Sequence, residues 1–303
     1  MLEKYVDQVR LLIDLLPHIA KEEEFALKGG TAINLFYRDL PRLSVDIDLT
    51  YLPIEDRSIS LKRVNETLDR ITQAITAGGF IKAQRIPGGG NSETRIIASV
   101  GKTRVKIETS PVSRGTVFPP QYREVSEAVQ EQFGFAEMRV VAFEDLYGGK
   151  LHAALDRQHP RDLFDVKLLY ENEGLTDDLF RVFLVYVASS GRPMHELLGP
   201  PPPLDDGLFD SEFAGMTRDD VSKKELNEVR SRLHSDIQQR LTGDIATFLL
   251  SLHDAEPDFD LIKLPSAAQL PAIKWKLMNL EKLKAENAEK HTEQRTRLEA
   301  LLA

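Results

Sequence analysis

The chain of 303 residues contains no cysteine. Without thiols it has no disulfide, no zinc thiolate centre and no thiol nucleophile, and this agrees with a reducing compartment. Its seven histidines show no metal-ligand spacing such as His-Glu-x-x-His, so the sequence gives no support to zinc chemistry. We expect His152 and His159 to be packing or capping residues.

Long apolar runs are also missing, because no stretch approaches the roughly 20 residues that cross a membrane. The first 20 residues place apolar side chains at helical spacing among scattered acidic residues, a pattern that predicts a helix and not a secretory signal. With 42% hydrophobic residues the chain can bury a sizeable core, as one large domain or two smaller ones. We expect a soluble cytoplasmic protein with no membrane partner.

A glycine-rich turn followed by a helix is the first feature that points to chemistry. Gly29 and Gly30 allow the backbone to turn tightly, and Thr31 stands just ahead of the helical pattern Ala32 to Tyr37. Unpaired amides and the dipole at the start of a helix favour an anion. The segment therefore predicts a phosphate site, in which a phosphate ester on Thr31 would repel substrate.

Two carboxylates follow this turn at strand spacing. Asp46 and Asp48 alternate with the apolar residues of the run Leu43 to Leu49, so period two places both on one face of a strand. Neighbouring acids repel each other unless a cation lies between them, and Mg²⁺ bound jointly with substrate phosphates suits such oxygen ligands. Alone, each motif is often only a turn or a solvated face. Their combination predicts a metal and nucleotide site.

The segment after these motifs predicts an α+β arrangement. A helix is expected over Ile59 to Ala77, and short strands follow; two of them, Thr94 to Val100 and Thr103 to Thr109, form a hairpin. The loop Pro87 to Asn91 is expected to be mobile. Glu108 shares a strand face with Lys106 and Arg104, which makes it the candidate for a third carboxylate beside Asp46 and Asp48.

Two further helices carry a second set of charged residues. After a strand at Met138 to Phe143, a helix from Glu144 brings Lys150 and Arg157, and Pro160 opens the next helix. Asp162 and Asp165 share a face near its positive end. Acids there stabilise a helix without touching a substrate, so a structural role for them remains an alternative.

Both sets of motifs resemble a known family. The order of GGT, a short helix and SVDIDL is similar to the first motif of nucleotidyltransferase-fold proteins and, in detail, of the AbiEii-like toxin family, which includes the MenT-type toxins. The segment Glu144 to Glu171 is similar to that family's later motif, a Lys on one helix followed by Arg-Asp-x-x-Asp on the next. The resemblance covers about residues 20–171.

The resemblance implies a fold and a reaction. It implies an α+β protein with a nucleotidyltransferase-fold catalytic domain and a mixed β-sheet over residues 1–172, followed by an all-helical domain over residues 173–303. It implies a Mg²⁺-dependent toxin of a toxin–antitoxin pair that transfers a nucleoside monophosphate from an NTP to the 3′ acceptor end of tRNA and so blocks translation. A cognate antitoxin protein is then the expected partner.

The same resemblance assigns roles to residues of this sequence. Lys150 is expected as a point charge on the nucleotide phosphates and Asp162 as a residue that organises the site. The expected catalytic residues are Asp46, Asp48, Lys150 and Asp162; the nucleotide-binding residues are Gly29, Gly30, Thr31 and Lys150; the metal ligands are Asp46, Asp48 and Glu108; Arg161 and Asp165 are further candidates.

The net charge of −9 is spread unevenly. Residues 82–123 hold eight Lys or Arg against Glu93 and Glu108, a local excess of six positive charges. Such an excess attracts a phosphate backbone even on an acidic protein, although Lys and Arg that keep strand edges soluble are an equal alternative. The candidate RNA-binding residues are Arg95, Lys102, Arg104 and Lys106.

Beyond Gly174 the sequence predicts helices throughout. A stiff connector runs from Gly199 to Leu204, and helical patterns follow over Thr217 to Leu252 and, as one long surface helix, over Pro271 to Ala303. The apolar stripe of that last helix, with Trp275, is expected to dock on the helical domain; partner binding or dimerisation is the alternative.

Two other functions remain open from the residues. A small-molecule nucleotidyltransferase, such as an antibiotic-modifying enzyme, would use the same metal site without needing the basic stretch. A catalytically silent scaffold of the same fold would act through protein contacts, and the intact Asp46, Asp48 and Lys150 argue against it.

Overall fold

The protein is described by a computed structural model that covers residues 3–86, 94–202, 204 and 206–303. The chain divides into two compact units. The sheet unit comprises Met1–Ala142 and Gly215–Asp220, and the helical unit comprises Phe143–Ala214 and Val221–Ala303. This division falls 30 residues before the predicted boundary at residue 172, because the two helices that carry Lys150 and Asp162 pack with the later helices.

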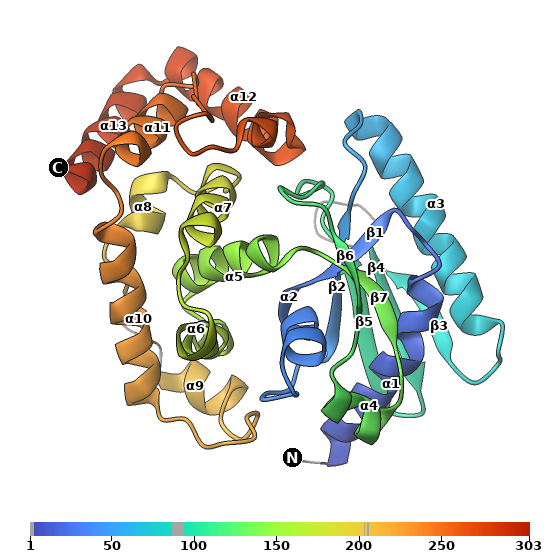
Figure 1. The fold of residues 1–303 in the computed structure, drawn as a ribbon. Helices are drawn as coiled ribbons and strands as arrows, with labels where there is room; N and C mark the ends of the chain where they lie inside the picture. The colour runs from blue at the N-terminus through green and yellow to red at the C-terminus, as the bar shows by residue number, and fades with distance from the viewer. Residues whose placement is uncertain (1–2, 87–93, 203, 205) are drawn as a thin grey trace. The chain divides into compact units, whose positions relative to one another are not determined.

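The sheet unit contains a mixed seven-stranded sheet with the order β3-β4-β5-β2-β1-β7-β6 (Figure 1). Strands β2 and β5 are parallel, as are β1 and β7, and the other neighbours are antiparallel. The strands are β1 (Phe25–Lys28), β2 (Asp46–Tyr51), β3 (Lys82–Ile86), β4 (Arg95–Val100), β5 (Thr103–Thr109), β6 (Gln121–Glu124) and β7 (Glu137–Val140).

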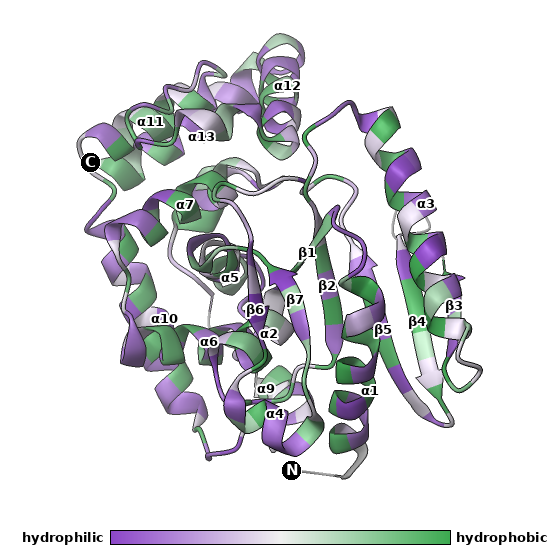
Figure 2. Cartoon of the chain, turned by 45° about the vertical axis from the view of Figure 1, so that its right-hand side comes forward, coloured by the Kyte–Doolittle hydropathy of each residue, from purple (hydrophilic) through white to green (hydrophobic). Residues whose placement is uncertain are grey.

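Two long helices, α1 (Glu3–Ile19) and α3 (Arg57–Thr76), pack on one side of the sheet (Figure 1). Along β2 and β5 hydrophobic and hydrophilic residues alternate (Figure 2), and Ile47, Val105 and Ile107 are fully buried. Period two therefore turns the intervening charged residues to the opposite face. This face is free of α1 and α3, which leaves the charged residues accessible for chemistry.

Short elements complete the sheet unit. Helix α2 (Gly29–Ala32) continues into a π-helix, η1 (Ile33–Tyr37), directly after β1, and α4 (Glu127–Phe133) lies between β6 and β7. The segment 215–220 returns to this unit because Arg42 forms a β-bridge with Thr217.

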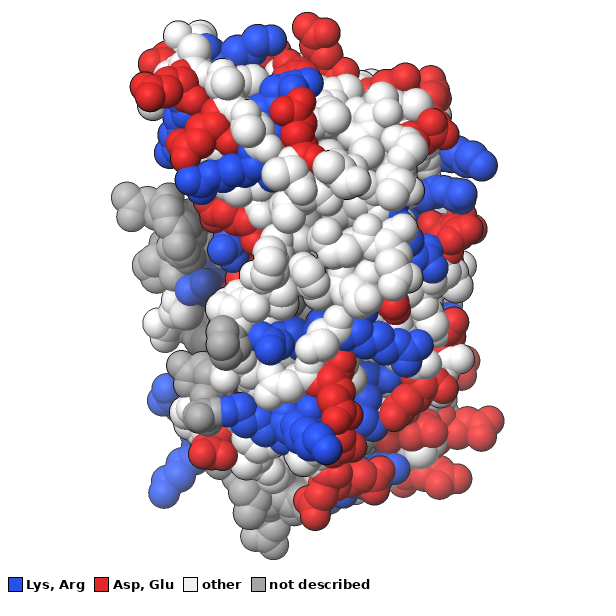
Figure 3. All heavy atoms as spheres, turned by 90° about the vertical axis from the view of Figure 1, so that its left-hand side faces the viewer, with Lys and Arg blue, Asp and Glu red and all other residues white. Residues whose placement is uncertain are grey.

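The helical unit is built around α5, which packs against α7, α6 and α8. Helix α10 packs on α6, and α13 contacts α8, α11 and α12. Acidic and basic side chains lie interspersed on the face of the molecule shown in Figure 3. The helices are α5 (Phe143–Arg157), α6 (Pro160–Asn172), α7 (Asp177–Ala188), α8 (Met194–Leu198), α9 (Asp206–Glu212), α10 (Lys223–Gln238), α11 (Asp244–His253), the 3₁₀ helix η3 (Pro265–Gln269), α12 (Pro271–Glu286) and α13 (Ala288–Leu302).

The fold class expected from the sequence is confirmed: the protein is mixed α/β, with a mixed sheet followed by helices. The predicted helix over Ile59 to Ala77 is α3, and the predicted hairpin of β4 and β5 closes at Gly101, whose φ of 56° suits glycine. Strand β2 begins at Asp46, three residues later than the alternation from Leu43 predicts. Strands β1 and β6 and helix α4 were not predicted, because they are too short to show a clear period.

The C-terminal helix prediction is wrong in two respects. Residues 271–303 form two helices because Asn287 leaves the helical conformation, with φ −148° and ψ 71°, and caps α13 by accepting from the Lys290 amide. Trp275 is 50% exposed, so it is not part of the buried face of α12, which consists of Ala272, Ile273, Lys276 and the expected Leu280.

Two expectations fall outside what the structure describes. The predicted loop Pro87 to Asn91 lies within residues 87–93, and one residue of the proline-rich connector, Pro203, is likewise outside the described residues. In the described part of the chain, no helix combines the length and the apolar character that a membrane span requires.

Candidate active site

Charged residues form one row across four strands of the sheet unit. Lys28 on β1 stands opposite Asp48 on β2, Asp48 opposite Glu108 on β5, and Glu108 opposite Arg95 on β4. In the adjacent row Asp46 stands opposite Lys106. Cross-strand neighbours on one face are about 5 Å apart at Cβ, so the register alone brings these side chains together. The expectation that Glu108 lies beside the two aspartates is confirmed.

Cations hold the outer carboxylates of this cluster. The Arg95 Nε atom donates to Glu108 Oε2 at 2.8 Å, and Lys106 Nζ lies 3.3 Å from Glu108 Oε1 and 3.8 Å from Asp46 Oδ2. The side chains of Asp46 and Glu108 are 44% and 27% exposed. The cluster is thus partly open to solvent, and its charges are within reach of a ligand.

Asp48, the central carboxylate, is the one whose charged form the surroundings destabilise. Burial raises the pKa of Asp48, and the neighbouring Glu108 and Asp46 raise it further against the opposing effect of Lys28. Burial also lowers the pKa of Lys28, which Asp48 and Glu108 oppose. A cation bound at Asp48 would therefore reduce the repulsion between Asp48 and the carboxylates of Asp46 and Glu108.

The two glycines are required by close contacts. Gly29 has φ +75°, and a Cβ atom there would lie 2.5 Å from Asp48 Oδ2. A Cβ atom at Gly30 would lie 2.6 Å from Arg42 Nη2 and 2.8 Å from Ser44 Oγ. The glycines therefore let the start of α2 approach the carboxylate strand. Helix α2 has no side-chain cap, so its first amides are not satisfied by a capping group.

Thr31 lies inside the helix and not ahead of it, because α2 begins at Gly29, three residues before the predicted start at Ala32. Its side chain is 1% exposed, and its hydroxyl donates to the Asp46 carbonyl oxygen, with Ser44 Oγ at 3.1 Å. This bond ties the first turn of α2 to the start of β2. The hydroxyl is thus buried and engaged by the protein itself.

A cavity of about 280 Å³ lies along the charged row. Lys28, Asp48, Glu108 and Arg95 all line it, together with the end of β5. Positive groups at the two ends and carboxylates in the middle give the cavity a charge pattern that suits a metal-bound polyphosphate.

The donor set fits a divalent cation held partly by substrate. Within the described residues, no group of three or more His, Asp or Glu side chains is arranged to hold a metal ion. Glu108 is engaged by Arg95 and Lys106, which leaves Asp46 and Asp48 as the carboxylates for the cation. Mg²⁺ is commonly bound through one or two carboxylates plus substrate phosphates, so this pair suffices.

The second set of predicted residues forms a sealed cluster in the helical unit. Lys150 Nζ on α5 lies 2.7 Å from Asp162 Oδ1 and 2.9 Å from Asp165 Oδ2 on α6. Arg157 donates to both oxygens of Asp162, at 2.5 and 2.9 Å. The side chains of Lys150, Asp162 and Asp165 are at most 6% exposed, whereas that of Arg157 is 60% exposed.

Pairing decides the charge state of this cluster. Burial acts to raise the pKa of Asp162, but Lys150 and Arg157 outweigh it and hold the pKa well below its usual range. Asp162 is therefore an anion that holds its basic partners in place. The expectation that it organises basic residues agrees with this geometry, while its part in the reaction stays a prediction.

Arg161 lies on the outside of the same helix start. Its amide donates to His159 Nδ1, and its guanidinium lies 3.6 Å from Glu212 Oε2. His159 thus caps α6, as expected, and its Nε2 lies 3.0 Å from the same Glu212 carboxylate.

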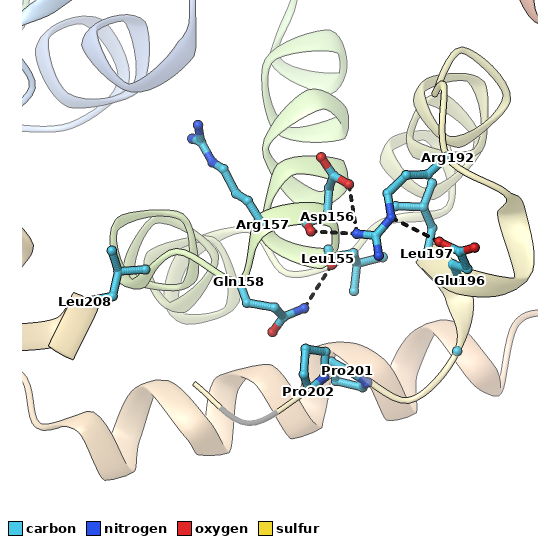
Figure 4. Close-up of a pocket in the computed structure, with 11 residues that line it drawn as sticks. Leu155, Asp156, Arg157, Gln158, Arg192, Glu196, Leu197, Pro201, Pro202 and Leu208 are labelled. Carbon is cyan, nitrogen blue, oxygen red and sulfur yellow. Dashed lines mark hydrogen bonds and ion pairs between the residues drawn. The ribbon is translucent and has the colours of Figure 1, made fainter. Parts of the chain in front are cut away.

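A cavity of about 260 Å³ lies next to the end of α5 in the helical unit (Figure 4). Its charged groups pair with each other: Arg192 Nη1 donates to Asp156 Oδ1 at 3.0 Å, and Arg192 Nε lies 3.5 Å from Glu196 Oε2. The Arg157 side chain points away from these groups (Figure 4). This cavity therefore offers no charge to a ligand.

The candidate RNA-binding residues divide into two kinds. Arg95 and Lys106 belong to the carboxylate cluster, whereas Lys102 and Arg104 are exposed. Other basic residues of the same region have partners distant in sequence, since Arg85 pairs with Asp69. The local excess counted along the sequence is thus partly neutralised in the fold.

Lys28 and Arg42 are site residues that the sequence reasoning missed. Lys28 directly precedes the two glycines, but β1 is only four residues long and was not predicted, so its register was unknown. Arg42 is 3% exposed, and its amide donates to Asn34 Oδ1, while Asn34 Nδ2 donates to the Gly30 carbonyl. A buried Arg after a helix carries no periodic signal that would reveal this role.

Comparisons with known proteins identify the family and a similar fold. The model of the family "Nucleotidyl transferase AbiEii toxin, Type IV TA system" matches residues 10–279. No curated protein matches the chain. Among solved structures, the fold is similar to that of MenT4, a nucleotidyltransferase toxin from Mycobacterium tuberculosis, with a TM-score of 0.58 and 14% identity over 91% of this chain and 93% of that one. The chain therefore belongs to the AbiEii nucleotidyltransferase toxin family of type IV toxin–antitoxin systems.

Proposed function

We propose that this toxin is a Mg²⁺-dependent nucleotidyltransferase that transfers a nucleoside monophosphate from an NTP to the 3′ acceptor end of tRNA and so blocks translation. The observation that carries the proposal is the row of Lys28, Asp48, Glu108 and Arg95 beside the uncapped start of α2. Nucleotidyl transfer needs positioning and charge neutralisation more than covalent catalysis, and this arrangement provides both.

Each part of the row has a distinct task in this reaction. Asp46 and Asp48 hold the cation, and their position on one strand face fixes their spacing. The first amides of α2, brought close by Gly29 and Gly30, bind phosphate oxygens of the NTP. Lys28 and Arg95 line the cavity on either side of the carboxylates and neutralise the triphosphate.

The cation supplies charge neutralisation at the phosphates and lowers the pKa of the attacking hydroxyl when it is bound. Lys106, which lies between Asp46 and Glu108, would have to move away from Asp46 for this carboxylate to hold a cation. The long flexible side chain of a lysine permits this movement without a change in the backbone.

The cluster of Lys150, Asp162 and Asp165 completes the family motif. Asp162 orients Lys150 and Arg157, and the Arg157 side chain, 60% exposed, is the part of this cluster that would contact a nucleotide or RNA phosphate. Lys102 and Arg104 offer a second exposed pair of charges for the acceptor backbone. A cognate antitoxin protein is the expected regulator, and the burial of Thr31 argues against direct phosphorylation of its hydroxyl in the folded state.

Incubation of the purified protein with each α-³²P-labelled NTP, total tRNA and Mg²⁺ tests the proposal. We expect label on intact tRNA with one NTP preferred, and no label in EDTA or with Asp46→Asn. Periodate oxidation of the 3′-terminal ribose, which destroys the acceptor hydroxyls, should abolish the signal. Label on a small aminoglycoside-type hydroxyl compound but not on tRNA would instead favour a small-molecule nucleotidyltransferase.

A further inference from the structure

A cavity of about 290 Å³ in the helical unit has no part in the proposed reaction. Residues of α12 and α13 line it together with the loop that follows α7 and with His253 at the end of α11. Its volume is at the lower end of the range found for small-molecule sites. None of the described residues that line it is acidic, whereas two of them, Lys276 and Lys290, are basic.

Lys276 is a buried cation without a carboxylate partner. Its residue is 6% exposed, and its Nζ atom donates to the carbonyl oxygens of Ser190 and Arg192, both at 2.8 Å. Burial lowers the pKa of Lys276 to about 8, and no acidic side chain raises it again. Two neutral carbonyls only partly compensate a charge removed from water, and the ammonium has a third proton to donate.

Other lining groups add specificity to this positive charge. Lys290 is exposed and brings a second ammonium, and the Asn279 and Gln294 amides provide donors and acceptors. Trp275 lines the same cavity and is 50% exposed, so part of the indole surface is open for stacking. Indole faces stack well on the flat rings of bases.

We propose that this cavity binds a nucleoside monophosphate, with the phosphate on Lys276 and Lys290 and the base on Trp275. The two ammonium groups are compact point charges of the kind that bind phosphate. If Lys276 served only to hold the loop after α7, its role would not explain Lys290, the exposed indole of Trp275 or the lack of acidic residues among the described residues that line the cavity.

Binding at this cavity can be measured without the transfer reaction. Trp275 is the single tryptophan of the chain, so its fluorescence reports on this cavity alone. Titration of the full-length protein with AMP in EDTA, where metal-dependent binding at Asp46 and Asp48 is disabled, should give a saturable change in tryptophan emission. Adenosine and inorganic phosphate serve as probes of the two halves of the ligand.

Three variants separate binding from structure. Lys276→Met should weaken AMP binding at least about 10-fold, because it removes a buried charge-assisted contact. Lys290→Gln, at an exposed residue that does not support the fold, should weaken it by a smaller factor. Lys274→Gln is the matched control, because Lys274 lies on the same helix, is exposed and bonds Gln269 outside the cavity.

Saturable quenching that Lys276→Met and Lys290→Gln weaken and Lys274→Gln leaves unchanged supports the proposal. No saturable change up to about 10 mM AMP, or equal affinity in wild type and Lys290→Gln, overturns it even if Lys276→Met fails to fold. Adenosine that binds as tightly as AMP overturns the phosphate site, and inorganic phosphate that binds as tightly as AMP overturns the stacking site.

Discussion

The sheet unit and the helical unit each contain a cluster of basic and acidic side chains, but the two clusters are built in opposite ways. In the sheet unit Asp46 and Glu108 are partly exposed and Asp48 bears the repulsion of its neighbours. In the helical unit Asp162 and Asp165 are fully buried, Lys150 lies 2.7 and 2.9 Å from them, and Arg157 also pairs with Asp162.

The difference shows that the surroundings of a carboxylate decide whether it binds a ligand or pairs with a cation of the protein. A carboxylate whose pKa is raised by its neighbours gains when a cation binds, whereas one whose pKa is held low by a buried lysine has its cation already. We infer that the sheet cluster is arranged to bind ligands and that the buried pairs of the helical cluster hold α5 and α6 together, while the part of Lys150 and Asp162 in the reaction stays a prediction. Separate effects of mutation on activity and on stability test this contrast.

The largest effect is expected for Asp46→Asn on transfer. Loss of one of the two carboxylates that hold the cation should reduce the rate at least about 1000-fold, or about 4 kcal/mol of transition-state stabilisation. Single-turnover transfer of label to tRNA at saturating Mg²⁺ measures it. Asp39→Asn, at an exposed residue outside the cluster, is the control, and full activity of Asp46→Asn would refute the metal assignment.

The next effect is on stability and concerns the sealed cluster. Lys150→Met removes the buried cation that lies between Asp162 and Asp165, and Arg157 still pairs with Asp162; the loss should lower the free energy of unfolding by about 3–5 kcal/mol. Lys167→Met breaks a helix-surface pair with Glu171 and should cost only about 0.5 kcal/mol. Urea unfolding followed by circular dichroism compares the two. Equal losses would mean that the cluster is not sealed.

A smaller effect is expected at the contact between α2 and β2. Gly29→Ala forces a side chain into the φ +75° conformation and against Asp48, which should cost about 1–3 kcal/mol and displace the carboxylate. Gly78→Ala is the matched control, since a Cβ there meets nothing within 4 Å. Melting temperature and transfer should both fall for Gly29→Ala alone; an unchanged transfer rate would separate the glycine from the site.

The smallest effect is expected at the exposed basic residues. Arg104→Glu should weaken tRNA binding and reduce the log–log salt slope by about 0.7–0.9 if one phosphate contact is lost, without changing NTP binding. Lys106→Met, inside the carboxylate cluster, should instead alter metal binding. Filter binding at several salt concentrations measures the slope, and an unchanged slope would place the RNA on another surface.

The arrangement of Asp46, Asp48 and Glu108 could be predicted from the sequence because it depends on patterns within short segments. The period-two alternation around Asp46 and Asp48 and the hairpin at Gly101 both lie within short segments, and they determined the face of Glu108 correctly. The register that brings Lys28 opposite Asp48 depends on a four-residue strand with no period of its own, and no local pattern reveals it.

The helical unit was harder to predict for a related reason. The spacing of Asp162 and Asp165 indicated a shared helix face, but whether that face is exposed depends on α5 and its Lys150, which tertiary packing decides. The break at Asn287 likewise depends on one residue inside an otherwise continuous helical pattern. The excess of basic residues in 82–123 was overestimated because partners such as Asp69 lie outside that window.

The most direct test of the contrast compares Asp48→Asn with Asp162→Asn by urea unfolding in EDTA. At pH 7 we expect Asp48→Asn to leave the free energy of unfolding unchanged or higher, because its raised pKa means that the charge costs stability. We expect Asp162→Asn to lower it by about 3–5 kcal/mol. Since the pKa of Asp162 is depressed, this contribution is complete above its usual value of 3.8 and declines as the pH falls below it, so the deficit should shrink at pH 3. A loss of stability in Asp48→Asn as large as that in Asp162→Asn would contradict the account, because both clusters would then be structural.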